Sequence, residues 1–205
     1  MPSITEVDNI KSLDDSGQTS ILTKTGTGVG GDKVFTLDNV TLGSSAVFPS
    51  GHILGIAQLQ QQETAGNSGG SAVATTFTAS VLNDEVFDTG GFVTLNSNQF
   101  ILLAGTYLIS AKKACYRVGV FTIRLYDVTN TAYIDPAGTN AYNPSDSGAT
   151  KNLFSTLNTK ITCSGDTTYE LRYYSAEARS GNGLGSAHGQ TLEVYTEVMI
   201  YKIQP

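Results

Sequence analysis

The strongest constraint on the fold is a regular alternation of apolar and polar residues, in runs of strand length, between residues 52 and 205. In the run 119–128, Phe121, Ile123 and Leu125 fall on one face of an extended chain, and mostly polar residues fall on the other. About eight such runs follow one another, separated by turns rich in Gly, Pro, Asn and Ser. This period is typical of half-buried antiparallel strands. It predicts an all-β protein, an antiparallel β-sandwich of the jelly-roll type.

The composition agrees with strands and turns rather than helices. Thr, Ser and Gly contribute 26, 19 and 22 of the 205 residues, whereas charged residues make up only 15%. Good helix formers are therefore too scarce to cover long solvent-facing helices, which excludes a helical bundle or a coiled coil. Cys115 and Cys163 lie within strand-like runs, and we interpret them as core thiols rather than a disulfide framework.

The net charge of −6 argues against two classes of partner. Binding to nucleic acid or to an anionic membrane surface requires clustered Lys and Arg, and the 12 present here are scattered. The longest apolar run, 100–104, is far shorter than the roughly 20 residues that span a bilayer. We expect no nucleic-acid partner and no membrane partner. The polar and acidic stretch 1–17 is unlike a secretion signal, so we expect the protein to be made and assembled in a cytoplasm.

Residues 1–50 differ from the rest because their apolar residues occur only in short groups between turn-rich segments. Such a stretch cannot bury enough surface to offset an ordering cost of about 1–2 kcal/mol per residue, so it needs a partner surface. We predict an extended N-terminal anchoring arm over 1–50 and a jelly-roll knob domain over 51–205. The residues expected to anchor the arm are Ile4, Val7, Ile10, Ile21, Leu22, Val34, Phe35 and Leu37.

Two predicted strands, around 52–59 and 191–203, carry apolar residues on both faces. In the second, Leu192 and Val194 are expected to share a face with Val198. A doubly apolar strand in an antiparallel protein is covered by a third layer, by another subunit or by local closure of a barrel; we favour a subunit interface. The residues predicted to form it are Ile53, Ile56, Leu59, Tyr195, Met199 and Tyr201.

The order of motifs in the knob domain resembles the jelly roll of the tumour-necrosis-factor and complement globular-head family. The segment 100–128 carries the Gly-x-Tyr of Gly105 and Tyr107 that starts a long strand in that family. The stretch ITCSGDTTYELRYY is similar to the turn between its late strands, and TEVMIYKI resembles its last strand, at the threefold axis. The resemblance implies a homotrimer.

A sharper likeness is to the versions of this domain in tailed phages, through the passage FPSGHILGIAQLQ at 48–60. An arm ahead of a trimeric knob resembles a capsid decoration (cement) protein, which implies a virion location and the major capsid protein as partner. The alternative is a short tail fibre whose knob recognises a host surface glycan. An enzyme that degrades polysaccharide is disfavoured because no paired acids face one cleft in the predicted strands.

No motif predicts catalysis, a cofactor or a metal site. GNSGGS at 66–71 resembles the nucleophile loop of serine proteases, but the upstream histidine, His52, has no place in such a triad, and a flexible connecting loop is the better interpretation. The glycine-rich stretches 26–33 and 181–189 lack the features of a phosphate loop. His52 and His188 lack the spacing of a zinc site.

The remaining polar residues are expected to have structural roles. Glu170, Glu193 and Glu197 lie on strands beside Arg172 and Lys202, which favours ion pairs. Binding functions usually lie in loops, and the longest here are 135–151 and 176–190. Their large contact residues are Tyr142 and Arg179, too few for a receptor or glycan site, so we predict plain distal loops.

Overall fold

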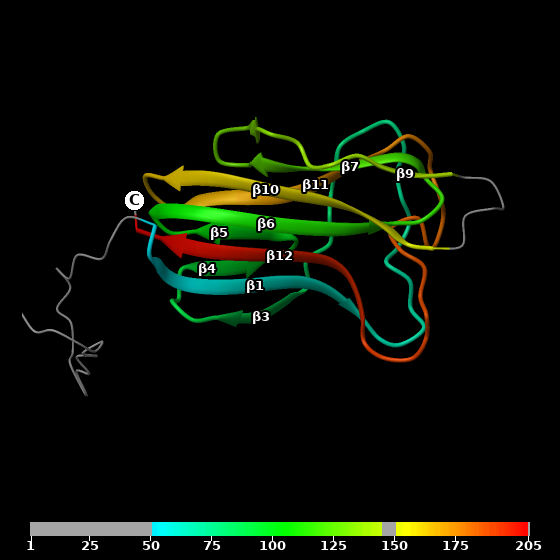
Figure 1. Cartoon of the computed structure of the whole chain (residues 1–205), viewed down its shortest axis with the longest axis horizontal. Coiled ribbons are helices and arrows are strands. Elements are labelled where there is room, and N and C mark those ends of the chain that lie inside the picture. The colour runs from blue at the N-terminus through cyan, green and yellow to red at the C-terminus, as the bar shows by residue number, and fades with distance from the viewer. Residues whose placement is uncertain (1–50, 145–150, 205) are drawn as a thin grey trace, which may run out of the picture. The chain divides into compact units, whose positions relative to one another are not determined.

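The computed structural model describes residues 51–144 and 151–204, and every element within them is a β-strand (Figure 1). The first sheet contains, in spatial order, β10 (Leu153–Cys163), β6 (Gly105–Cys115), β12 (Glu193–Ile203), β1 (Ile53–Glu63) and β3 (Asp84–Asp88). The second contains β4 (Val93–Asn96), β5 (Gln99–Leu102), β11 (Thr167–Ser175), β7 (Gly119–Asp127) and β8 (Ala132–Ile134), with β2 (Thr78–Ala79) beside β11 and β9 (Ala141–Asn143) beside β7.

The chain changes sheets in the order of a jelly roll. β1, β6, β10 and β12 belong to the first sheet, and β5, β7, β9 and β11 belong to the second, with every named pair antiparallel. In Figure 1 the first sheet lies in front of the second. The predicted all-β antiparallel sandwich of the jelly-roll type is therefore confirmed.

The core lies between the two sheets and is made by the inward residue of each alternating pair. Phe121, Ile123 and Leu125 of β7 are fully buried, and the Phe121 ring stacks on Tyr173 with centroids 5.7 Å apart. Each such side chain contributes about 1.5–3 kcal/mol through its burial. Cys115 and Cys163 are buried free thiols, as the sequence predicts.

A bulge in β12 changes which residues face the core. The register of β1 with β12 passes over Tyr195, so the residues on either side of it are out of phase. Val198 and Ile200 are fully buried, whereas Leu192 and Val194 are 54% and 36% exposed. The expectation that these residues share one face is wrong, because a single extra residue reverses the alternation.

The predicted arm and all of its anchor residues lie outside the described residues. Within 51–144 and 151–204, no helix is long and apolar enough to cross a membrane.

Candidate interaction face

The first sheet packs one face on the core and turns the other away from the second sheet. Along β1, Ala57 and Leu59 belong to the core. The alternate residues Ile56, Gln58 and Gln60 therefore point outward, and the same alternation holds on the neighbouring strands. We call these outward side chains the outer face: Phe87 on β3, Ile56, Gln58 and Gln60 on β1, Glu197, Met199 and Tyr201 on β12, Leu108, Ser110 and Lys112 on β6, and Asn158 and Lys160 on β10.

An apolar row crosses the outer face. Tyr201 lies directly opposite Ile56 on one side and opposite Leu108 on the other. Leu108 is 43% exposed, and Ile56, Tyr201 and the adjacent Met199 are half-buried. These side chains keep apolar surface in water, and a second protein could bury it with a gain of about 25 cal/mol per Å².

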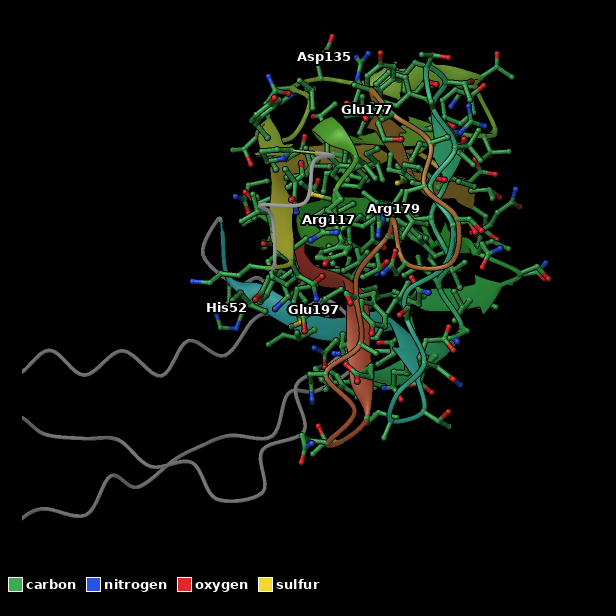
Figure 2. The ribbon with its side chains drawn as sticks, turned by 90° about the vertical axis from the view of Figure 1, so that its right-hand side faces the viewer. His52, Arg117, Asp135, Glu177, Arg179 and Glu197 are labelled. Carbon is green, nitrogen blue, oxygen red and sulfur yellow. The ribbon has the colours of Figure 1, made fainter. Side chains whose placement is uncertain are left out.

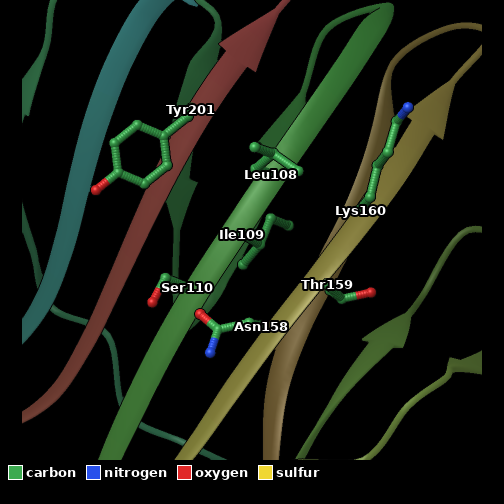
Figure 3. Close-up of a pocket in the computed structure, with 7 residues that line it drawn as sticks. All are labelled: Leu108, Ile109, Ser110, Asn158, Thr159, Lys160 and Tyr201. Atoms are coloured by element: carbon green, nitrogen blue, oxygen red, sulfur yellow. The ribbon is translucent and has the colours of Figure 1, made fainter. Parts of the chain in front are cut away.

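A pocket of about 410 Å³ lies on the outer face between β12, β6 and β10 (Figure 3). Its lining residues are Leu108, Ile109, Ser110, Asn158, Thr159, Lys160 and Tyr201. Figure 3 shows Leu108 between the Tyr201 ring and the Lys160 side chain, whereas the Ile109 side chain belongs to the core. The pocket therefore continues the apolar row of Ile56, Tyr201 and Leu108 toward β10.

Glu197 has three hydrogen-bonding partners on the outer face. Lys112 Nζ lies 2.9 Å from Glu197 Oε1, and the Nε2 atoms of Gln58 and Gln60 each donate to Glu197 Oε2 at 3.0 Å. Partial burial by itself would raise the pKa of Glu197, but Lys112 and the two amides outweigh it and lower the pKa. Glu197 therefore forms an ion pair, as expected, but its partner is Lys112 rather than Arg172 or Lys202, and Lys160 adds a further positive charge to the outer face.

A layer of two loops covers one end of the first sheet. Tyr195 is only 3% exposed, and its hydroxyl donates to the carbonyl oxygen of Asn67 at 2.9 Å. Gly69 and Gly185 lie so close to the Tyr195 ring that a Cβ at either position would overlap it. The alternative of a third layer is therefore realised at this end of the sheet, and loops form it instead of a helix.

The loop layer joins the two glycine-rich motifs, 66–71 and 181–189. Gly69 N donates to Gly185 O at 2.9 Å, and Leu184 N donates to Gly70 O at 3.0 Å. Ala72 and Arg179 exchange both of their backbone hydrogen bonds, at 2.8 and 3.1 Å. The motif GNSGGS is thus part of a hydrogen-bonded layer and not a free connecting loop. Sequence reasoning missed this pairing because hydrogen bonds between backbones leave no residue pattern.

The residues predicted for a subunit interface separate into two groups. Ile56, Met199 and Tyr201 lie on the outer face, and Ile53, at the start of β1, is 48% exposed. Leu59 is fully buried in the core, and Tyr195 is covered by the loop layer. Neither can lose further surface to a partner, so those two assignments are corrected.

Ser68 and His52 cannot act as a catalytic pair in this fold. His52 precedes β1 and Ser68 follows it, so an 11-residue strand of roughly 35 Å separates them. The Ser68 hydroxyl instead accepts a hydrogen bond from Ala187 N at 3.3 Å, within the loop layer.

Glu193 fastens the loop layer to β12. Its Oε1 atom accepts hydrogen bonds from the backbone N–H groups of Gly189, His188 and Gly66 at 2.8, 3.0 and 3.4 Å, and these bonds lower its pKa. His188 Nε2 lies 3.5 Å from Glu193 Oε2, so Glu193 faces His188 rather than Lys202. The described residues contain no group of three or more His, Cys, Asp or Glu arranged to hold a metal ion.

A small aromatic and cationic group lies at the loop end of the knob, where the 176–190 loop meets the turn between β6 and β7. Arg117 and Arg179 lie beside each other there (Figure 2), 5.2 and 5.1 Å from the centre of the Tyr116 ring. Tyr142 on β9 is 67% exposed. Residues 145–150, part of the predicted 135–151 loop, are outside the described residues.

Comparison with known proteins yields similarity of structure alone. No protein-family model matches the sequence, and no curated protein matches it at a significant level. PRD1 vertex protein P5 is similar with a TM-score of 0.47 and 15% identity, over 75% of this chain and all of that one. Murine APRIL has a TM-score of 0.46 and 10% identity, over 72% of this chain and 98% of that one. The globular domain of zebrafish complement 1qA protein has a TM-score of 0.45 and 13% identity, over 73% and 98%.

Proposed function

We propose that three copies of this chain associate through their outer faces, and that the trimer is a non-enzymatic structural protein of a phage virion. The observation that supports the trimer is the apolar row of Ile56, Tyr201 and Leu108. It stays partly in water although Tyr201 lies on β12, the central strand of its sheet. The internally balanced Glu197 group beside the row lowers the cost of bringing two such faces together.

The virion role rests on the sequence. The passage at 48–60 resembles the entry into phage knob domains, and residues 1–50 have the pattern of an arm that needs a partner surface. The role we infer is that of a capsid decoration protein, with the arm bound to the major capsid protein and the trimer adding avidity. Electron microscopy of particles labelled with an antibody to the knob tests this assignment: label on the tail, with none on the shell, would contradict it.

The trimer is tested by multi-angle light scattering of the full chain at micromolar concentration. Wild type should have three times the 21.6 kDa mass of one chain. Tyr201→Asp and Leu108→Lys should each reduce the mass to that of a monomer, because each buries a new charge at the centre of the contact, and the second places that charge opposite the like charge of Lys160 on β10. Val73→Glu is the matched control, since Val73 is 49% exposed and its backbone bonds to β11 of the second sheet. A monomeric wild type would overturn the proposal.

A further inference from the structure

A cluster of arginine and aromatic side chains lies on the outward side of the second sheet, on the face opposite the proposed interface. We call it the arginine–tyrosine patch, and it consists of Phe77, Arg124, Tyr126, Tyr133, Arg172 and Tyr174. All six side chains are half-buried. The sequence does not indicate this patch, because most of its residues lie on three strands, β7, β8 and β11, and come together only through the register of those strands.

The two guanidinium groups are stacked on aromatic rings. Arg172 lies 3.5 Å from the centre of the Tyr126 ring, and Arg124 lies 4.6 Å from that of Tyr133. The Tyr126 and Tyr133 rings are themselves 4.9 Å apart and inclined by 60°. This stacking fixes both arginines in position, so a ligand that binds them need not order long flexible side chains.

The charge balance of the patch is uneven. Arg124 lies directly opposite Arg172 on the adjacent strand, an arrangement in which like charges repel. Arg172 is neutralised by Glu170 at 2.7 Å, a carboxylate whose side chain is only 11% exposed, in the ion pair that the sequence predicts. Arg124 pairs with Asp135 at 2.6 Å, but the Asp135 side chain is 84% exposed and points outward at the edge of the molecule (Figure 2).

An ion pair with so exposed a partner contributes at most about 1 kcal/mol, so another carboxylate can replace Asp135 at little cost. Arg124 is therefore the point of the patch that complements an anionic ligand. A guanidinium binds a carboxylate through two parallel hydrogen bonds, and aromatic rings beside it offer flat apolar faces and tyrosine hydroxyls. We propose that the patch binds an acidic polysaccharide, in which a carboxylate is attached to a sugar ring.

A sugar fits this surface better than a protein does. A stable protein interface requires about 800 Å² from each partner with a dry apolar centre. Here the rings are interleaved with guanidinium, carboxylate and amide groups, including Gln99, whose Nε2 donates to Glu170 at 2.8 Å. Such groups pair readily with sugar hydroxyls. The patch lies on the second sheet, so binding there does not depend on whether the outer face forms a trimer.

Calorimetric titration of the full chain tests the proposal with two acidic probes, tri-galacturonic acid and sialyllactose. Galactotriose supplies the rings of the first probe without their carboxylates, and lactose is the second probe without its sialic acid residue. We expect at least one acidic probe to bind at least tenfold more tightly than its neutral counterpart. Arg124→Gln should weaken that binding at least tenfold, and Arg124→Lys, which keeps the charge but loses the planar fork, should also weaken it.

Arg179→Gln is the matched control, because it removes the same charge at the loop end, and it should change the affinity less than twofold. Thermal unfolding of every variant shows whether it is folded. The proposal is overturned if neither acidic probe is preferred, or if both folded Arg124 variants bind as wild type does. It is also overturned if a polyglutamate peptide of equal charge binds as tightly as the sugar, since the ligand would then be an acidic peptide.

Discussion

Lys113 is a fully buried cation in the core of the sandwich. Its ammonium donates to Thr196 Oγ1 at 2.8 Å and to Gln61 Oε1 at 3.4 Å, and it lies 5.6 Å from the centre of the Tyr173 ring. Among the described residues no carboxylate forms an ion pair with it. Desolvation lowers the pKa of Lys113 to about 7.

This shift determines a pH dependence of stability. The folded-state pKa lies below the usual lysine value, so the unfolded chain binds more protons between pH 7 and pH 10. The destabilising contribution of Lys113 is therefore complete below pH 7, decreases as the pH rises and disappears near the unfolded pKa. Stability attributable to this residue increases from neutral to alkaline pH.

Replacing Lys113 with Met should stabilise the protein. Thr196 and Gln61 already hydrogen-bond to each other at 3.2 Å, so both keep a partner without the lysine. Urea unfolding at pH 6 should show a gain of about 1–4 kcal/mol for Lys113→Met, shrinking toward pH 9. A variant less stable than wild type throughout this range would mean that the hydrogen bonds outweigh desolvation.

At the residue scale, the alternation of the sequence predicts which side chains are buried. It does not predict how a buried charged side chain such as Lys113 is accommodated. The alternation in β6 puts Lys112 and Lys113 on opposite faces, so one of them had to point into the core. Nothing in the residue types indicates that Thr196 and Gln61, both distant in sequence, would receive its ammonium. The stacking of Arg124 and Arg172 was equally hidden, because it depends on the register between β7 and β11.

At the scale of elements, periodicity predicted the strands well, whereas the departures from periodicity depend on tertiary structure. The bulge at Tyr195 arises where β12 passes beneath the loop layer. The sequence identifies the glycines of the motifs 66–71 and 181–189 as turn residues. Their actual role includes close approach to the Tyr195 ring, which a sequence pattern does not reveal.

A pair of glycine variants tests the close approach. Gly185 has a φ of +126° and its Cβ would overlap the Tyr195 ring, whereas Gly181 has a φ of +79° and a Cβ there would meet no atom within 4 Å. Both substitutions to Ala strain the backbone, but only the first also displaces the ring. Gly185→Ala should lower the free energy of unfolding by about 1–3 kcal/mol more than Gly181→Ala does, measured by denaturant titration. Equal losses of unfolding free energy in the two variants would show that the loop layer accommodates the Gly185→Ala methyl group without an energetic cost.

At the scale of the whole molecule, the fold class could be predicted from the sequence. The layer of loops that covers one end of the first sheet could not. In the sequence, the strand at 191–203 is apolar on both faces. Of its apolar residues, Tyr195 lies under the loop layer, whereas Met199 and Tyr201 lie on the outer face. Separating the two requires knowing where the loops at 64–72 and 176–190 lie in space.

The proposed anchoring role of residues 1–50 predicts the behaviour of a truncated chain. Deleting residues 2–40 should leave a folded trimer by circular dichroism and light scattering, because residues 51–204 supply both sheets and the core between them. The truncated protein should no longer bind purified phage heads in a sedimentation assay, while the full chain should. Full occupancy of the heads by the truncated protein would refute the arm assignment.

The loop layer also makes the two ends of the proposed trimer different from each other. It thickens each copy only at the end of β1 that follows Glu63, whereas the chain enters β1 at the opposite end, at Gly51. Three copies joined through the uncovered part of the first sheet must splay apart where the layer stands between them. The assembly would then taper toward Gly51, so that the three Gly51 residues, one from each copy, would lie together at its narrow end.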